Sequence, residues 1–504
     1  MSRDDTVSVA VVGAGMGGLA AAIRLAASGH RVTVLERASE PGGKVGRAQA
    51  DGCFFDTGPT VLTMREVLDD LFGEAGTSLD DHLTLIQHDP EFRYHFDDGT
   101  SLEVGPTLES TIDRVRSTLG SKPADEFADF MDYSRSIWEA AAPNFIFSEA
   151  PSVGSMVKLG FRQMSAIRDI DPMTTMWKAI TSRVESPHLQ KILARYATYN
   201  GSDPRQAPAT LNCISWVELG EGSWGVEGGM FELPRALHRL ATSMGVTFQF
   251  DADVTSLRRR SEGWAVETSD GPAPMEVDCV VANSEVSHLA DELLGPAESG
   301  WTPSSTPSSM SGWNAVLRVR RRPRAARPSH QVVFPRDYMA EFEDIFDRGI
   351  PPADPTVYVC AQEKAHMREG WSDHEPLFVM ANAPPLSSDE MPESSPEADS
   401  WDDLRRRVLR RLTATGLIDD DEAAEDAVVW ERTPVELARR FPGSRGGIYG
   451  ASSNSKMAAF NRPANRVDAL DGLYLAGGSA HPGGGVPMCL QSGKLAARAL
   501  LEDH

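Results

Sequence analysis

The segment VSVAVVGAGMGGLAAAIRLAASGHRVTVLE, residues 7–36, decides the fold of this 504-residue chain. Its first six residues are mostly apolar and β-branched, which is typical of a buried parallel strand. The GAGMGG that follows places Gly13, Gly15 and Gly18 in the spacing GxGxxG. An alanine-rich stretch ending at Gly29 predicts a helix, and RVTVLE predicts a second strand that ends at Glu36.

A strand, a glycine turn, a helix and a second strand ending in an acid together form a dinucleotide-binding unit. The glycines allow a pyrophosphate to approach the backbone at the start of the helix. Glu36 would bind the ribose hydroxyls and favours a ribose without a 2′-phosphate. This stretch alone fits FAD and NAD equally.

A second glycine cluster lies in GLYLAGGSAHPGGGVPMCLQSGKLAARALL, residues 472–501. LYLA predicts a strand that leads into a turn too glycine-rich to be filled by side chains. Pro487 suits the first turn of the helix that follows. Bare backbone beside a helix N-terminus suits a planar ring that gains negative charge, as a flavin does on reduction. We therefore expect these glycines to make room for a flavin.

Several stretches resemble one known family. ERASEPGGK (36–44) and DTGPT (56–60) resemble the FAD-binding half of the amine-oxidase and phytoene-desaturase superfamily. The C-terminal cluster closely resembles the signature of bacterial carotenoid desaturases, the phytoene-desaturase family. RYATYNGSDP, WGVEGGMFELPRAL and ARRFPGSRGGIYG are similar to its 1-hydroxycarotenoid 3,4-desaturases (methoxyneurosporene dehydrogenases). The resemblance extends from residue 9 to residue 500.

The resemblance implies an α/β fold, with a Rossmann-like FAD-binding domain of the amine-oxidase and phytoene-desaturase type and an inserted α+β substrate domain. We expect the discontinuous FAD-binding domain to comprise residues 1–110, 225–310 and 429–504. Residues 111–224 and 311–428 would form the substrate-binding, membrane-facing domain.

The cofactor implied is FAD, and the resemblance also implies which residues bind it. They are drawn from the two glycine turns, the GGK and DTGPT segments and the strand after residue 253: Gly13, Gly15, Gly18, Glu36, Arg37, Gly43, Lys44, Gly58, Pro59, Thr60, Val254, Gly478, Ser479, Val486, Pro487 and Met488. Gly478-Ser479 replaces the Gly-Asp pair that other flavoproteins carry beside the ribityl chain.

The family's reaction passes a hydride from an allylic carbon to flavin N5 and removes a proton from the neighbouring carbon. His481 and Glu227 are the candidate catalytic residues. His481 could equally bond backbone in the glycine loop, and Glu227 could be an exposed turn residue. For the substrate tunnel the candidates are Arg195, Tyr196, Tyr199, Trp216 and Trp224, each of which could instead pack or pair internally.

Composition limits the partners and the setting. A net charge of −24 argues against nucleic acid. The five cysteines form no CxxC pair, which favours reduced thiols and excludes a zinc site of that type. Without a spanning stretch or a signal peptide, the sequence predicts a cytoplasmic protein. The insolubility of a carotenoid substrate predicts peripheral attachment to the inner face of the cell membrane.

Two segments allow two interpretations each. The six arginines of residues 318–327 could attract anionic lipid or form a solvated basic edge strand stopped by prolines. Residues 152–180 could be an amphipathic membrane-facing surface or a core-facing helix pair.

Three functions compete. The first is 3,4-desaturation of an acyclic 1-hydroxycarotenoid, and the second is a phytoene-type multistep desaturase, a carotenoid isomerase or a ketolase. The third is a binding protein of the same fold, against which the intact ribose acid and GGK segment argue. Quinone or oxygen would be the electron acceptor.

Overall fold

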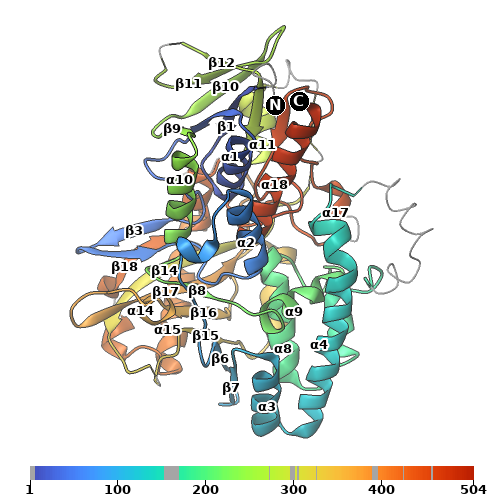
Figure 1. The fold of residues 1–504 in the computed structure, drawn as a ribbon. Helices are drawn as coiled ribbons and strands as arrows, with labels where there is room; N and C mark the ends of the chain where they lie inside the picture. Colours follow the sequence, from blue (N-terminus) through green and yellow to red (C-terminus); the bar gives the residue numbers. More distant parts are fainter. Residues whose placement is uncertain are drawn as a thin grey trace.

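A computed structural model describes residues 6–151, 170–271, 273–295, 301–303, 306–324, 326–388, 396–423, 425–455 and 458–504. Two sheets organise the molecule, one above the other in the view of Figure 1. The upper sheet is parallel and lies beside both chain termini, and the lower sheet is larger and mixed.

The parallel sheet has five strands in the order β19-β13-β1-β2-β9. They are β1 (Ser8–Val12), β2 (Arg31–Leu35), β9 (Thr247–Gln249), β13 (Cys279–Ala282) and β19 (Leu473–Leu475). Three segments far apart in the sequence therefore meet in one sheet, which gives the Rossmann-like arrangement expected of residues 7–36.

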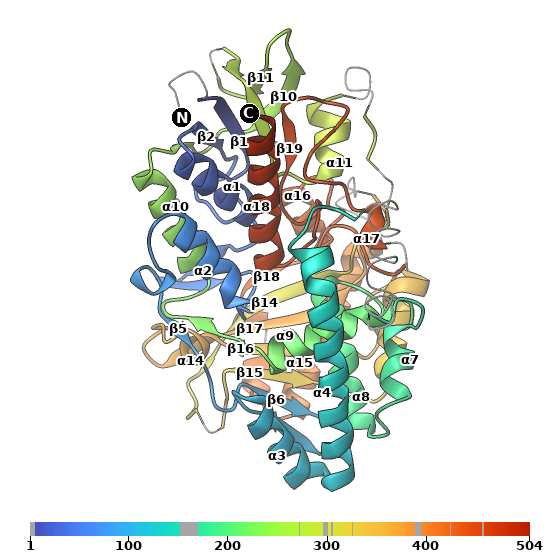
Figure 2. The same ribbon diagram turned by 45° about the vertical axis from the view of Figure 1, so that its right-hand side comes forward.

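Both faces of β1 are buried, as its apolar sequence predicts. Val9 and Val11 pack against the helices α1 (Met16–Ala27), α10 (Glu232–Ser243) and α18 (Val486–Asp503). Ala10 and Val12 pack on the other side against the small sheet of β10 (Val254–Arg259), β11 (Trp264–Thr268) and β12 (Met275–Val277). Figure 2 shows α1 and α18 side by side along the parallel sheet.

The mixed sheet has seven strands in the order β18-β14-β17-β16-β15-β6-β7. They are β6 (Phe92–His95), β7 (Ser101–Val104), β14 (Ser311–Arg320), β15 (His330–Val333), β16 (Val357–Ala361), β17 (His374–Ala383) and β18 (Val428–Arg432). Each pairs antiparallel with its neighbours except that β6 and β15 run parallel.

Alternation along these strands gives the mixed sheet two different faces. Odd-numbered residues such as Trp313, Val359 and Val379 pack against α15 (Pro396–Ala414). Even-numbered residues such as Val332, Phe378 and Met380 face the opposite way and line a cavity. One face thus supports the fold and the other forms the floor of the cavity.

Helices and short ribbons complete the structure. Those next to the mixed sheet are α3 (Leu108–Leu119), α4 (Ser121–Ala141), α7 (Met176–Thr181), α8 (Pro187–Arg195), α9 (Cys213–Leu219), α13 (Tyr338–Phe342) and α14 (Gln362–Ala365). The others are α2 (Arg65–Glu74), α11 (Val286–His288), α16 (Pro434–Arg440), α17 (Ala458–Asn461) and the pairs β3 (Arg47–Ala50) with β4 (Cys53–Asp56) and β5 (Leu85–Ile86) with β8 (Gly225–Val226).

The expected domain boundaries differ from the strand pairing at three strands. β6 and β7 fall in segment 1–110, which we assigned to the FAD-binding domain, yet they form the edge of the mixed sheet. β18 (Val428–Arg432) crosses the expected boundary between residues 428 and 429 and pairs with β14. The reason is that β6 finds its partner in β15, more than 200 residues later, a pairing that local sequence does not reveal.

The arginine-rich segment is neither a lipid-binding patch nor an edge strand. β14 lies inside the sheet, between β17 and β18. Arg327 is buried with Glu375, 3.0 Å away, and Arg321 pairs with Glu363. The remaining arginines bond Asp51, Asp419, Asp421 and His88. Carboxylates therefore pair with five of these six arginines, and Arg324 bonds His88.

No helix in the described ranges is long and apolar enough to cross a membrane. Of residues 152–180, residues 152–169 lie outside the described part. In α7, which follows them, Met176, Ala179 and Ile180 are buried against the core, whereas Met173 just before α7 is 73% exposed.

Candidate cofactor and substrate site

A cavity of about 1040 Å³ lies between the two sheets. The starts of α1 and α18 contribute its upper wall, and the even-numbered face of the mixed sheet contributes its floor. Its remaining walls are mostly apolar: Trp138, Phe145, Ile146, Ile170, Leu211, Ile214 and Val217. A volume at the upper end of ordinary ligand sites suits a large molecule.

The first glycine turn brings bare backbone to this cavity. Gly13 has a positive φ of 98°, which glycine adopts without strain. Gly18 does not line the cavity. A Cβ there would lie 2.1 Å from the carbonyl oxygen of Gly13, so Gly18 permits the turn to pack under α1. The N–H groups at the start of α1 have no partner within the helix and suit a phosphate.

Glu36 follows β2 and its carboxylate faces the same turn. Oε2 accepts a hydrogen bond from the Ala14 N–H at 2.6 Å, and Oε1 accepts one from the Ala38 N–H at 2.8 Å. These bonds hold the carboxylate at the carboxyl ends of β1 and β2, where a ribose binds in this fold.

The second glycine turn leads into α18. Gly485 caps this helix with a φ of 108°, and Pro487 lies in its first turn. A Cβ on Gly485 would meet nothing closer than Met488 Cγ at 4.0 Å, so the missing side chain leaves open space on the cavity side. A Cβ on Gly17 would lie 2.6 Å from the Gly477 nitrogen, which shows that the two glycine turns touch.

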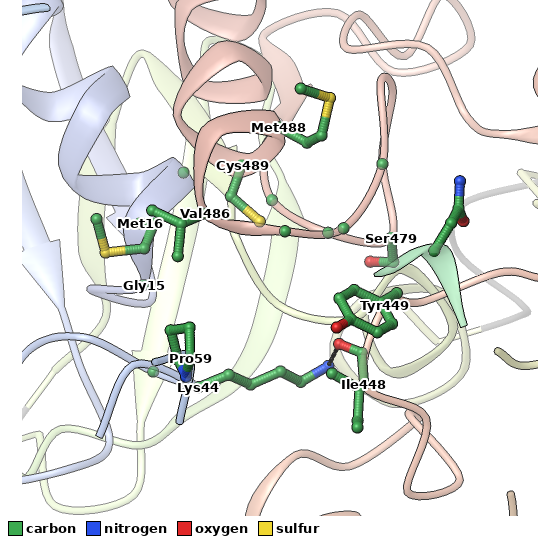
Figure 3. A pocket seen from close by; sticks show the side chains of 18 of the residues that line it. Gly15, Met16, Lys44, Pro59, Ile448, Tyr449, Ser479, Val486, Met488 and Cys489 are labelled. Carbon is green, nitrogen blue, oxygen red and sulfur yellow. Dashed lines mark hydrogen bonds between the residues drawn. The ribbon is translucent and has the colours of Figure 1, made fainter. Parts of the chain in front are cut away.

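Lys44 crosses the site between the two turns. Its Nζ lies 2.8 Å from Glu285 Oε1 and donates to the carbonyl oxygens of Gly447 and Ile448, each at 3.1 Å. Figure 3 shows this side chain extending from the neighbourhood of Pro59 to Ile448, with Met16 and Val486 facing it from α1 and α18. Glu285 was not predicted, and its only sequence signal is its place just after β13.

The expected FAD-binding residues come together in this cavity. Apart from Gly18, all of them line it: Gly13, Gly15, Glu36, Arg37, Gly43, Lys44, Gly58, Pro59, Thr60, Val254, Gly478, Ser479, Val486, Pro487 and Met488. Two helix N-termini, a carboxylate and open space beside Gly485 fit the pyrophosphate, ribose and ring of FAD. Among the described residues, no cluster of side chains could hold a metal ion.

The two expected catalytic residues lie in different settings. His481 lines the cavity and is 3% exposed, and its Nε2 donates to the Ser148 carbonyl oxygen at 2.9 Å. Burial lowers the pKa of His481, which keeps its ring neutral. Glu227 is exposed, its backbone N–H donates to Thr84, and it lies outside the residues that line the cavity. This placement fits the alternative that Glu227 is an exposed turn residue.

Of the five expected substrate residues, Arg195 and Tyr199 line the cavity. Tyr196 is fully buried and does not line the cavity. Trp216 and Trp224 are also absent from the described residues that line it. Trp216 packs on Gly220 and under Arg135, while the Trp224 backbone pairs with Leu62. Neither tryptophan is therefore placed to contact a molecule in the cavity.

Arg195 is the centre of a buried cluster. Its guanidinium donates to Tyr199 and Tyr94 at 3.1 Å and lies 3.5 Å from Glu218 Oε1. The hydroxyls of Tyr196 and Tyr199 both donate to Glu218. Burial raises the pKa of Tyr94 to about 12, so this phenol keeps its proton. Glu218 was missed because neither its spacing nor its neighbours in α9 mark it.

A further polar chain was missed on the floor of the cavity. Tyr358 of β16 bonds Thr60 Oγ1 at 2.6 Å and His330 Nδ1 at 2.8 Å. Thr60 was expected, but for cofactor binding only. No role was expected for Tyr358 or His330, because their contact arises from the pairing of β15 with β16.

The fold and site define an FAD-dependent oxidoreductase, and comparisons with known proteins agree. The model for flavin-containing amine oxidoreductases matches residues 16–501, and the chain belongs to this family. It is 38% identical to the hydroxyneurosporene desaturase of Rhodobacter capsulatus, over 100% of this chain and 99% of that one. It is 36% identical to that of Rubrivivax gelatinosus, over 98% and 93%.

A solved structure of a putrescine oxidase mutant with redesigned cofactor binding matches 99% of this chain and 100% of its own, with a TM-score of 0.61 and 15% identity. At that identity the likeness supports the fold alone. The expected α/β fold is thereby confirmed, and membership of the flavin-containing family confirms the expected FAD cofactor.

Proposed function

We propose that the protein is a carotenoid desaturase that forms the C-3,4 double bond of an acyclic 1-hydroxycarotenoid, with FAD as the oxidant. The observation that carries the proposal is the continuity of one cavity. Its lining includes the FAD-binding turns, a long apolar wall and, on the same surface, Arg195 and Tyr199. The names of the two hydroxyneurosporene desaturases point to the same substrate class.

When bound, FAD supplies the chemistry of the reaction by accepting a hydride from the allylic carbon. The chain's own residues hold the reactants and exclude water. The apolar walls of Trp138, Ile214 and Val217 would align the polyene beside the second glycine turn. The first N–H groups of α18 would face the ring edge where negative charge develops.

The polar wall would distinguish the hydroxylated end of the substrate. Although the Arg195 guanidinium already bonds Tyr94, Tyr199 and Glu218, its buried Nε–H has no acceptor among the described residues, which is costly beside hydrocarbon. A hydroxyl placed near Arg195 and Tyr199 would accept such a hydrogen bond. This arrangement supports a hydroxycarotenoid over phytoene.

We also propose a peripheral association with the membrane, from which the substrate would enter. Phe145, Ile146, Ile170 and Pro172 line the cavity. Beside them, Phe147 and Met173 are 37% and 73% exposed. Exposed apolar side chains next to an apolar cavity wall suit contact with lipid acyl chains. Quinone or oxygen would reoxidise the flavin, and assays under air and with an anaerobic quinone would distinguish them.

The test is expression in cells that accumulate a 1-hydroxylated acyclic carotenoid and, in parallel, in cells that accumulate phytoene. We expect a red-shifted product two hydrogens lighter, in the first cells only. Conversion of phytoene to longer chromophores would instead identify a multistep desaturase. A product with added oxygen, or with unchanged mass, would identify a ketolase or an isomerase.

A further inference from the structure

We infer that Tyr358 accepts the proton that the desaturated carbon loses, and passes its own hydroxyl proton to His330. This inference rests on the proposed function, because it assigns the second hydrogen of that same reaction. The proton acceptor inferred here is therefore neither His481 nor Glu227, the two candidates that the sequence suggested.

The geometry is set by two neighbouring strands. In the register of β15 and β16, His330 is opposite Cys360 and Tyr358 is opposite Val332. His330 and Tyr358 are therefore diagonal neighbours on one face of the sheet, which is within reach for aromatic side chains. Their rings are nearly parallel, with centroids 6.1 Å apart, and the hydroxyl lies 2.8 Å from Nδ1.

The hydroxyl of Tyr358 connects the cavity to the protein interior. Tyr358 and Thr60 both line the cavity, whereas His330 lies behind them and is 2% exposed. If Thr60 donates its hydroxyl proton to Tyr358, then Tyr358 donates to Nδ1 and keeps a lone pair for an incoming proton. Thr60 also follows Pro59, which faces Lys44 in the cofactor site (Figure 3).

The position of His330 is fixed by its neighbours. Its ring lies between Phe92, with centroids 5.1 Å apart, and Tyr358, and its edge faces His88 at 6.0 Å. A buried base held in one orientation costs little reorganisation when the proton arrives.

The atoms and electrons of the step balance. One C–H bond breaks as a hydride leaves for FAD, and the remaining positive charge is delocalised along the polyene. The neighbouring C–H bond then breaks, and its electron pair becomes the second bond of C=C. The proton goes to the Tyr358 oxygen while the O–H bond of Tyr358 breaks and its proton goes to His330 Nδ1.

The electrostatic setting suits this transfer. Burial lowers the pKa of His330 far below its ordinary value, and the neighbouring His88, His366 and Arg195 act in the same direction. Its imidazole is therefore unprotonated and available at neutral pH. A weak base is sufficient, because a carbon next to a cationic centre is a very strong acid. Burial also raises the pKa of Tyr358, so its hydroxyl is protonated before the step.

Single-turnover flavin reduction tests the inference in purified, FAD-loaded enzyme with a 1-hydroxylated acyclic carotenoid in detergent. Product is quantified by chromatography, in H₂O and in D₂O. Tyr358→Phe should lower product formation by about 100-fold, the range for lost acid–base catalysis, and should abolish the solvent isotope effect. FAD content should stay the same. Tyr338→Phe is the matched control, since Tyr338 is buried, outside the cavity lining, and its hydroxyl has no partner among the described residues.

Two variants separate proton transfer from positioning at His330. His330→Asn can accept a hydrogen bond from Tyr358 but cannot hold a proton, and His330→Leu can do neither. We expect both to be about equally slow. Recovery of activity in His330→Asn would restrict His330 to orienting Tyr358 and would overturn the transfer.

The outcomes distinguish the inference from the proposed function. An active wild-type enzyme with Tyr358→Phe within threefold of it would overturn the inference alone. If His481→Asn rather than Tyr358→Phe lost the isotope effect, the proton would go to His481, and the inference would again be wrong. If the wild type desaturated no carotenoid, the proposed function would fail and the inference with it.

Discussion

Glu36 and Gly484 belong to the two glycine-rich regions that form the FAD site, and they contribute in different ways. Glu36 supplies a carboxylate already fixed by two backbone N–H groups. Gly484 contributes by having no side chain, because a Cβ there would lie 2.6 Å from the Cα of Tyr449.

Substitution at either residue should therefore yield colourless protein. In Glu36→Ala the loss of hydrogen bonds to a charged group should weaken FAD binding by about 2 kcal/mol, or roughly 30-fold. In Gly484→Val the side chain would push the Tyr449 backbone into the site. Flavin absorbance per protein and titration of the apoprotein with FAD measure both effects. Gly73→Ala, at a helical glycine with open space around it, should stay yellow; fully loaded Glu36→Ala would contradict the assignment.

Because Glu91 is buried, it makes the stability of the protein depend on pH. It is 4% exposed, and burial together with the nearby Glu218 raises its pKa to about 9, although Arg195 acts in the opposite direction. The native state therefore holds this proton at pH values where the unfolded chain, with a pKa near 4.5, has released it. Because the native state binds more protons in this range, the contribution of Glu91 to stability falls as pH rises from about 4.5 to 9.

Glu91→Gln should remove that slope. We expect the free energy of unfolding of the variant, relative to wild type, to rise by about 1 kcal/mol per pH unit between pH 6 and 8. Urea unfolding, monitored by circular dichroism at pH 6 and at pH 8, gives the difference in the free energy of unfolding between variant and wild type at each pH. Equal differences at pH 6 and pH 8 would show that Glu91 is ionised in the native protein.

At the scale of elements, the crossing of α1 and α18 positions both helix N-termini at the cofactor. The two helices touch where Gly493 meets Gly17, and a Cβ on Gly493 would lie 2.3 Å from the Gly17 carbonyl oxygen. Backbone groups occupy this contact, so no flexible side chain can yield. The crossing thus requires glycine at position 493, although Gly493 lies inside a helix where glycine is unfavourable.

Gly493→Val should separate the helices and destabilise the protein by about 3 kcal/mol, as overpacking does. It should also weaken FAD binding, because separating the helices displaces the N-termini that bind the cofactor. Thermal unfolding with and without FAD measures the effect, with Gly73→Ala in α2 as the control. A Gly493→Val enzyme with unchanged melting temperature and FAD content would show that the helices adjust freely.

The elements near the cofactor could be predicted from sequence, and those of the substrate region could not. β1, α1, β2, β19 and α18 have local signals: apolar strands, glycine turns and a first-turn proline. Strand pairing between distant segments has no such signal, so the sequence did not show that β6 pairs with β15 or that β14 lies inside the mixed sheet. For the same reason Tyr358 and His330 were not recognised, whereas Lys44 was found within a motif.

At the scale of the whole molecule, charge and exposed apolar side chains together define how the protein would meet a membrane. The net charge is −24 and the arginines of residues 318–327 are engaged with acidic partners and His88. Electrostatic attraction to anionic lipid is therefore not expected. The apolar side chains Phe147 and Met173 are the available contact.

The Phe147→Ser, Met173→Ser double variant should lose binding to phosphatidylcholine vesicles by severalfold in a flotation assay, since it removes apolar area from the contact. Ile350→Ser is the control, because Ile350 is 46% exposed but is not among the cavity residues. Adding phosphatidylglycerol should not strengthen binding of the wild type. Strong dependence on anionic lipid would instead locate the contact at a basic surface.

The two faces of the mixed sheet have a consequence for how this protein can change over generations. Residues with even numbers on β14 to β17, such as 314, 332, 358, 378 and 380, border the cavity, while their odd-numbered neighbours hold α15. Variation at even positions would alter which molecule is accepted and would leave the packing against α15 in place. New substrate preferences are thus accessible by substitutions that conserve side-chain volume at these mostly buried positions, and a mutant library restricted to them, with Tyr358 left unchanged, would sample such preferences.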